Sequence, residues 1–409
     1  MSHQGNEPAT DRPPVTADVS PPDAVLEDVG TRQWRIAGLR LNASSLRAYT
    51  MLFALIAIWL FFQWATEGIF LGPRNFSNLF KQMAVTGVLA VGMLLVIVAG
   101  QIDLSVGSVV GLAGGVAAMT QGWGLVPSLA SAIVIGIVIG AVQGGLVAYA
   151  NIPAFIVTLG GMLAWRGVIL RWSEGATIPV RLPFFRSLGI DFVAPIIGLA
   201  LAVLAVAALI WLTLRRAALR RHHGLPAQGI PASIARVAVP ALLFFAFVYM
   251  MNTQGGVPIP VVVLLAVALA GAFLTQNTTF GRYLYAIGGN PDAARLSGIN
   301  LRRQILLSFC LLGTLVGVAS LLHTARVGSA SPDAGTWMEL DAIAACVIGG
   351  TSLMGGRGTV VGAMLGALIM ASLDNGMSLE NVQNSTQYII KGVVLVAAVG
   401  FDMLGRRKG

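Results

Sequence analysis

Long uninterrupted apolar runs recur along almost the whole chain after residue 47. Each is roughly 17 to 24 residues long, the length that an α-helix needs to cross a hydrocarbon core of about 30 Å. We place them near residues 48–65, 82–99, 104–121, 127–149, 152–171, 192–214, 236–252, 259–275, 304–322, 340–355, 358–374 and 386–402. Spanning β-strands are a poor alternative, because barrel strands alternate apolar and polar residues over about ten positions. The pattern predicts an all-α polytopic integral membrane protein with about 12 membrane segments.

The composition supports this fold class. Hydrophobic residues make up 56% of the 409 residues and charged residues only 11%, which lies far from an ordinary soluble domain. The net charge of +9 would favour nucleic-acid binding in a soluble protein. Here the basic residues gather at the edges of apolar segments, as topology signals do, so no nucleic-acid partner is expected.

Residues 1–47 are predicted to be a disordered cytoplasmic tail, and residues 48–409 a membrane domain. Residues 1–30 hold five prolines and six carboxylates, and no signal-peptide core occurs before about residue 50. Four arginines then precede the first segment, which places the amino terminus in the cytoplasm. Three further basic stretches fall on the same side by alternate counting: residues 215–223, 276–303 and 406–408. Both termini are therefore expected to be cytoplasmic.

Two blocks of sequence resemble each other. Val96–Gly100 followed by Gly107–Gly111 matches Cys346–Gly350 followed by Gly358–Gly362, with one residue inserted. Such similarity is typical of transporters built from two related halves. Glycine- and valine-rich helices also resemble one another by composition alone. The expected fold thus includes a two-half pseudo-repeat.

Each block interrupts an apolar run, at Gln101–Ser105 and at Thr351–Arg357. Backbone groups at such a break need a partner from protein or from water in a cavity, so the breaks point toward a translocation path. The alternative is a tight turn at a membrane face, where Asp103 or Ser105 caps the next helix. Glycines at helical spacing, such as those that begin at Gly136, allow close helix contact, by default within one subunit.

The chain carries no recognisable motor or catalytic site. A phosphate-binding loop ends in Gly-Lys-Ser/Thr, whereas Lys81, Lys391 and Lys408 follow other residues. No catalytic triad or metal site can be assembled, so the chain is expected not to be an enzyme and to bind no metal. A transporter of this kind would borrow ATP hydrolysis from a partner or use an ion gradient.

Ion coupling requires ionisable groups deep in the membrane. The candidates are Asp103, Arg166, Asp341, Asp374 and Lys391. Most lie near a segment end, where capping or snorkelling explains them. An ion-gradient-coupled secondary sugar transporter is therefore the alternative function, and a passive sugar channel is a third.

A polar stretch between the eighth and ninth apolar runs predicts a short self-capped helix. Asn290 is a good N-cap, Pro291 fits the first helical position, and Asp292 suits the positive end of the helix dipole. Gly298 can end the helix in the left-handed conformation. About two turns cannot cross a bilayer, so the helix lies on the membrane surface, either gripped by a partner or as an ordinary amphipathic loop. The segment comprises Asn290, Pro291, Asp292, Ala293, Ala294, Arg295, Leu296, Ser297 and Gly298.

Several motifs resemble one family. They lie at residues 101–107, 155–160, 281–282, 285–290, 297–299 and 345–351. In sequence and order they are similar to the permease subunits of bacterial ABC importers for ribose, xylose and galactose. The resemblance implies an inner-membrane homodimer in contact with lipid, which receives a monosaccharide from a periplasmic sugar-binding protein. It also implies a coupling helix at 290–298 that engages a cytoplasmic ABC ATPase, which binds ATP-Mg in place of this chain.

Within that family, the xylose-type members are the most similar. The segments 192–214 and 236–252 look like a pair inserted into a ten-span core, and Met370–Ser378 resembles the xylose-type sequence there. D-xylose is therefore the expected cargo.

We hypothesise that the sugar passes between two copies of the chain. The path would be lined by Asp103, Thr158, Trp165, Thr351, Asp374 and Asn375, whose hydroxyl, amide, carboxylate or aromatic groups suit a pentose. Each of them can equally be a packing residue. The path should hold sugar weakly, because tight binding would slow its release.

Overall fold

The computed structural model describes residues 34–36, 39–41, 43–222 and 230–407. The chain divides into two units, residues 1–47 and 48–409. In the first unit, β1 (Trp34–Ile36) and β2 (Leu39–Leu41) pair antiparallel. The prediction of a disordered tail did not include this hairpin. The predicted disorder of residues 1–33 lies outside the described residues.

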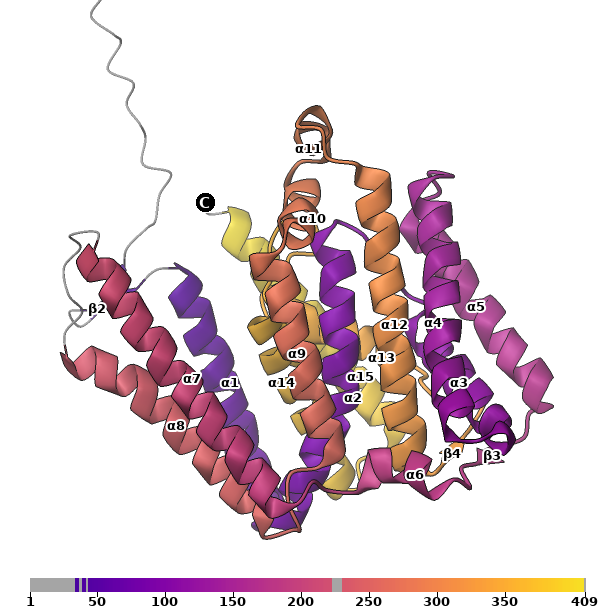
Figure 1. Cartoon of the computed structure of the whole chain (residues 1–409), viewed down its shortest axis with the longest axis horizontal. Coiled ribbons are helices and arrows are strands. Elements are labelled where there is room, and N and C mark those ends of the chain that lie inside the picture. The colour runs from indigo at the N-terminus through magenta and orange to yellow at the C-terminus, as the bar shows by residue number, and fades with distance from the viewer. Residues whose placement is uncertain (1–33, 37–38, 42, 223–229, 408–409) are drawn as a thin grey trace, which may run out of the picture. The chain divides into compact units, whose positions relative to one another are not determined.

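The larger unit is helical, as predicted (Figure 1). Its helices are α1 (Ala43–Ala65, which begins in the first unit), α2 (Pro73–Val98), α3 (Val106–Thr120), α4 (Leu125–Ala148), α5 (Ala154–Ser173), α6 (Pro183–Ile190), α7 (Pro195–His222), α8 (Ile230–Asn252), α9 (Ile259–Asn277), α10 (Thr279–Gly289), α11 (Pro291–Leu296), α12 (Leu301–Val327), α13 (Met338–Ile348), α14 (Val360–Leu379) and α15 (Asn384–Arg407). A short 3-10 helix, η1 (Gln121–Trp123), precedes α4. The strands β3 (Ile178–Pro179) and β4 (Ser329–Ala330) pair antiparallel.

Each of the predicted membrane segments coincides with a helix, but two of these helices are short. Among the described residues, 7 helices are long and apolar enough to cross a membrane: α2, α4, α5, α7, α9, α12 and α14. By contrast, α3 has 15 residues and α13 has 11. At 1.5 Å per residue they reach only about 22 and 16 Å, less than a hydrocarbon core of about 30 Å. The predicted segments 104–121 and 340–355 therefore do not form full helical spans, because the backbone leaves the helix at the two breaks.

The packing is repeated within the larger unit. Helix α4 lies along α12 as α14 lies along α2, and α3 packs against α12 as α13 packs against α2. This arrangement pairs α2 with α12, α3 with α13 and α4 with α14, as expected of two related halves. The matching sequence blocks lie at the α2–α3 and α13–α14 connections. They therefore mark the two breaks and are not equivalent positions of the two halves.

Helices α4 and α12 approach each other through glycine. A Cβ atom built on Gly136 would lie 2.1 Å from the carbonyl oxygen of Gly313, and one on Gly140 would lie 2.3 Å from that of Phe309. No side chain fits in this space, so glycine is required for the close contact. This glycine set packs within the chain, as expected.

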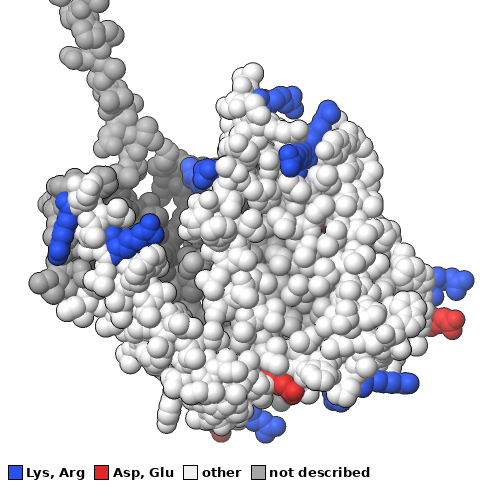
Figure 2. Space-filling model, in the orientation of Figure 1, with Lys and Arg blue, Asp and Glu red and all other residues white. Residues whose placement is uncertain are grey.

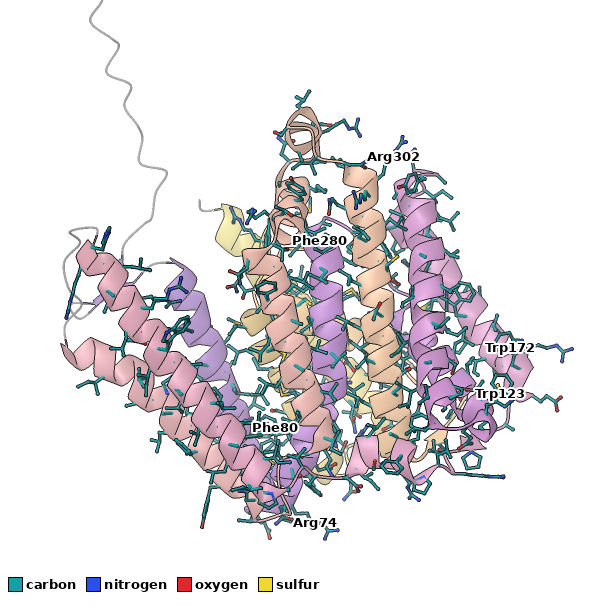
Figure 3. All side chains as sticks on the ribbon, viewed as in Figure 1. Arg74, Phe80, Trp123, Trp172, Phe280 and Arg302 are labelled. Atoms are coloured by element: carbon teal, nitrogen blue, oxygen red, sulfur yellow. The ribbon has the colours of Figure 1, made fainter. Side chains whose placement is uncertain are left out.

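Charged side chains mark the two ends of the larger unit. In the face shown in Figure 2, the surface over α9 and α12 is almost free of charged side chains between its ends. Arg302 lies at the end that carries α11, and Arg74 lies at the opposite end (Figure 3). The carboxyl-terminal end of α15 lies at the α11 end (Figure 1). The structure thus separates two charged ends by an apolar belt, as a membrane requires.

Candidate functional site

The predicted coupling helix is α11, and its ends are formed as the sequence indicated. The side-chain oxygen of Asn290 accepts hydrogen bonds from the backbone N–H groups of Asp292 at 3.1 Å and Ala293 at 3.0 Å. Pro291 takes the first helical position. Gly298 follows the helix in the left-handed region, with φ of 81°. These local bonds fix the helix without help from the rest of the chain.

The exposure of α11 suits a partner surface. Leu296 is 89% exposed, and Ala293 and Arg295 are also exposed, whereas Ala294 is 4% exposed. An apolar side chain of this size in water is unusual where it is presented at the tip of a rigid element. Ala294 faces inward and fixes the helix to the body of the protein.

The adjoining helix α10 forms the base of α11 and was not anticipated as a separate element. It is amphipathic, with Gly281, Leu284 and Ile287 buried. The hydroxyl of Tyr285 donates to the carbonyl oxygen of Gly358 at 2.8 Å. Burial raises the pKa of Tyr285, which keeps this hydroxyl protonated as a donor. Helix α10 is therefore anchored to the segment that leads into α14.

Two glycine turns meet the carboxyl end of α10, where Gly288 lies in the last turn of the helix. A Cβ on Gly288 would lie 1.9 Å from the carbonyl oxygen of Val98, and one on Gly355 would lie 2.9 Å from the Cα of Gly288 and 3.0 Å from that of Gly100. The backbone N–H of Gly356 also donates to Val98 at 2.9 Å. The base of α11 is thus in backbone contact with both broken segments. We call these contacts the glycine junction, defined by Gly100, Gly288, Gly355 and Gly356.

Two of the proposed path residues are bonded within the protein around the first break. Asp103 is 4% exposed, and its Oδ1 accepts from the backbone N–H of Ser105 at 2.7 Å and from its hydroxyl at 2.6 Å. The Thr158 hydroxyl donates to the carbonyl oxygen of Ala154 at 2.8 Å. The space beside Asp103 is about 10 Å³, at or below the volume that one water needs. In this conformation Asp103 supports the turn that begins α3.

Two other path residues have buried polar atoms without a hydrogen-bond partner. These are the Nε1 of Trp165 and the Oγ1 of Thr351. Trp165 lies on α5 and Thr351 in the second break. A buried donor or acceptor without a partner costs free energy, and both atoms are closed to solvent in this conformation.

The remaining two path residues are neighbours in sequence but differ in environment. Asn375 is 2% exposed and exchanges two hydrogen bonds with the Asn75 amide, at 2.7 and 3.1 Å. The Asp374 carboxylate lies 2.8 Å from the Nζ of Lys391. Lys391 in turn contacts both carboxylate oxygens of Asp341, at 3.0 and 3.1 Å. Asn375 therefore joins α14 to α2, and Asp374 belongs to a charge cluster formed with Asp341 and Lys391.

This charge cluster brings together three of the five ionisable residues that the sequence singled out in apolar segments. Arg166, a fourth, lies elsewhere and donates to the carbonyl oxygens of Pro332 and Ala334. The aromatic neighbours of the cluster, Trp337 and Tyr388, were not predicted as site residues. Their only sequence signal was proximity to Asp341 and Lys391 along the chain. In the described part of the chain no group of three or more metal-ligand side chains is gathered.

Comparison with known proteins agrees with this architecture. The family described as branched-chain amino acid transport system, permease component, matches residues 75–221 and 224–399. The chain is 45% identical over 371 residues to the xylose transport system permease protein XylH of Escherichia coli (strain K12), which covers 90% of this chain and 94% of that protein. It is 43% identical over 373 residues to XylH of Haemophilus influenzae, covering 90% and 99%.

A second group of relatives is more distant. The ribose import permease protein RbsC of Escherichia coli (strain K12) is 37% identical over 331 residues, which covers 80% of this chain and 85% of that protein. No solved structure matches the chain. With its membrane-length helices and its similarity to these permeases along most of its length, the chain belongs to the family of transport-system permease components.

Proposed function

We propose that this chain is the permease subunit of an ATP-binding-cassette importer for D-xylose. The cargo follows from the similarity to XylH, which is named for xylose transport and exceeds the similarity to the ribose permease. The permease itself would not hydrolyse ATP. A separate cytoplasmic ATPase would bind ATP-Mg, and a periplasmic sugar-binding protein would deliver the sugar.

The glycine junction is the observation that carries this proposal. Helix α11 is a rigid exposed tip, and the junction at its base contacts both broken segments through backbone atoms. Because backbone contacts cannot yield by side-chain rotation, a displacement of α11 is transmitted to the α2–α3 and α13–α14 connections. A motor that grips the tip can therefore move two membrane segments together.

The proposal includes an orientation of the chain in the membrane and a dimeric assembly. The α11 end would face the cytoplasm, and both termini would lie on that side. Two copies of the chain would enclose the path in the lipid bilayer of the inner membrane, because transporters commonly place their path between related halves or subunits. The tail before residue 48 has no assigned transport role.

The proposal is tested with vesicles that hold the permease, its partner ATPase and ATP. Uptake of labelled D-xylose should require all three components and a sugar-loaded binding protein, and unlabelled D-xylose should compete better than ribose. Accumulation in vesicles that hold only a proton or sodium gradient would favour the secondary-transporter alternative. Equilibration without accumulation would indicate a channel.

A further inference from the structure

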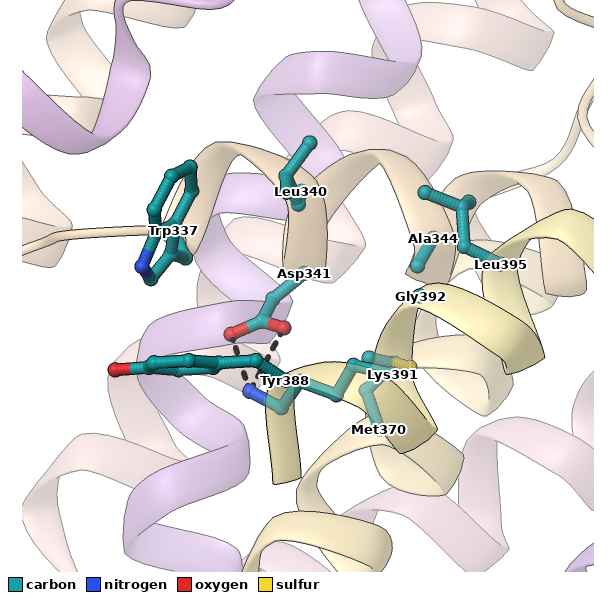
Figure 4. A pocket seen from close by; sticks show the side chains of 9 residues that line it. All are labelled: Trp337, Leu340, Asp341, Ala344, Met370, Tyr388, Lys391, Gly392 and Leu395. Carbon is teal, nitrogen blue, oxygen red and sulfur yellow. Dashed lines mark hydrogen bonds and ion pairs between the residues drawn. The ribbon is translucent and has the colours of Figure 1, made fainter. Parts of the chain in front are cut away.

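A cavity of about 240 Å³ lies between α13, α14 and α15, beside the charge cluster (Figure 4). Its walls include Trp337, Tyr388, Ala344 and Met370, together with Asp341 and Lys391. The volume is suited to a small polar ligand held by a few directed groups on an otherwise apolar surface. None of these residues takes part in the glycine junction.

The charge cluster indicates that this face does not meet lipid. The side chains of Lys391 and Asp374 are 19% and 29% exposed, although both lie in helices of the membrane domain. Charged groups within a bilayer face the bundle interior or a water-filled cavity, because exposure to lipid is costly. The surface that α13 and α15 present around Lys391 is therefore part of an aqueous path or is covered by protein.

The cluster also has unused hydrogen-bonding capacity. Two carboxylates share one ammonium group, and each carboxylate oxygen has two lone pairs. Lys391 donates to Asp341 and contacts Asp374, which fixes the positions of both acceptors. Fixed carboxylate oxygens are well suited to accept hydrogen bonds from hydroxyl groups.

Two aromatic rings complete the cavity. Trp337 and Tyr388 meet edge to face with ring centroids 6.2 Å apart, beside the Asp341–Lys391 pair (Figure 4). They are 45% and 50% exposed, so their faces are accessible. Aromatic faces carry negative charge density and attract the weakly positive C–H groups of a saturated ring. A pyranose ring presents both kinds of group, with C–H bonds on its faces and hydroxyls at its rim.

We propose that this cavity is a contact site for a neutral monosaccharide on the translocation path, with Trp337 and Tyr388 against the ring and Asp341, held in place by Lys391, accepting hydrogen bonds from its hydroxyls. The inference rests on the proposed function and specifies where the permease touches its cargo. Asp341 lies in the first turn of α13, and Lys391 lies two turns into α15. Asp374 precedes Asn375 on α14, and Asn375 bonds to Asn75 near the start of α2. This part of α14 therefore lies at the end of the bundle opposite α11. The site is thus on the entry side, where sugar arrives.

The experiment uses the permease with its ATPase and binding protein in vesicles, and measures D-xylose import and ATP hydrolysis together. The main variant is Trp337→Ala with Tyr388→Ala, since truncating half-exposed rings leaves no buried void. We expect the number of sugars imported per ATP to fall about tenfold, because the ring contacts are lost while α11 is untouched. ATP hydrolysis stimulated by the loaded binding protein should remain within about twofold of the parent.

Matched variants separate a sugar contact from a structural role. Trp123→Ala removes a 78% exposed tryptophan outside the cavity and should leave import unchanged. Trp337→Phe with Tyr388→Phe keeps both ring faces and should restore most of the import. Lys391→Arg should retain more import than Lys391→Met, because it keeps the charge between the two carboxylates.

Three results would count against this site. If the double alanine variant keeps the parent ratio of sugar to ATP, the rings do not touch the cargo. If an ionophore abolishes import by the parent while ATP is present, import depends on an ion gradient, which counts against a neutral-sugar contact as the role of the charge cluster. If the parent complex imports no D-xylose with ATP, the proposed function itself fails, and this inference falls with it.

Discussion

Within the six residues of α11, two side chains two positions apart differ sharply in exposure. Leu296 is 89% exposed and Ala294 is 4% exposed. Leu296→Asp places a charge where an apolar side chain would dock into a partner groove, which should reduce ATP-driven import at least about tenfold. Because the residue is in water, the amount of inserted permease should not change. Import and membrane-protein level are measured in the same vesicles.

Two further substitutions serve as comparisons for Leu296→Asp. Leu219→Asp puts the same charge at a half-exposed leucine near the end of α7 and should leave import intact. Ala294→Asp buries a carboxylate, so it should lower thermal stability as well as transport. Full transport by the Leu296→Asp protein would show that α11 is not the motor contact.

The amide pair between Asn375 and Asn75 predicts a change in stability. Asn375→Ala leaves the Asn75 amide with only its bond to the carbonyl of Phe70, at 2.8 Å. Asn75 is half-buried and lines a cavity, so water can replace part of the lost bond; we expect a cost of about 1 kcal/mol and a lower melting temperature in detergent. The double variant Asn75→Ala with Asn375→Ala should cost less than the two single losses together, and strict additivity would argue against a direct pair.

At the scale of elements, two adjacent glycines of α10 should respond differently to an added methyl group: Gly288, in the glycine junction, should not tolerate it, and Gly289, outside the junction, should. A Cβ on Gly288 would lie 1.9 Å from a backbone oxygen, whereas nothing lies within 4 Å of one on Gly289. Gly288→Ala must push the junction apart at a cost of about 1–3 kcal/mol, and it should lower import per ATP hydrolysed. Gly289→Ala should behave as the parent in the same assay. Equal import by both variants would mean that the junction does not transmit movement.

The elements themselves were largely predictable from the sequence. Each predicted apolar run coincides with a helix, and Asn290 with Pro291 located α11, because caps act through bonds within a few residues. Run length alone did not separate the short helices α3 and α13 from full spans, since α3 passes directly into the 3-10 helix η1 and α13 ends at Ile348, inside the predicted run 340–355. Nor could the charge cluster, because Asp341, Asp374 and Lys391 meet only through the packing of α13, α14 and α15.

At the scale of the whole molecule, the pair α7 and α8 is closed at its base like a hairpin. The backbone N–H of Val193 donates to the carbonyl of Val257 at 2.9 Å, and that of Ile259 donates to Asp191 at 3.0 Å. Phe192 and Pro258 form a bridge between these bonds. The chain therefore leaves the remaining bundle and returns to it at adjacent points, as an inserted pair should.

This closure allows the pair to be removed without stretching the chain. Replacing residues 194–256 by Asn-Gly joins Val193 to Val257 through a two-residue turn of the kind that antiparallel strands favour. The loss of Phe247, whose ring lies 4.8 Å from that of Phe80, should cost some thermal stability. The glycine junction, α11 and the charge cluster lie outside the removed residues, so ATP-driven import of D-xylose should persist at a reduced level. If the shortened chain inserts and folds but imports nothing, α7 and α8 would be part of the transport machinery and not an addition to it.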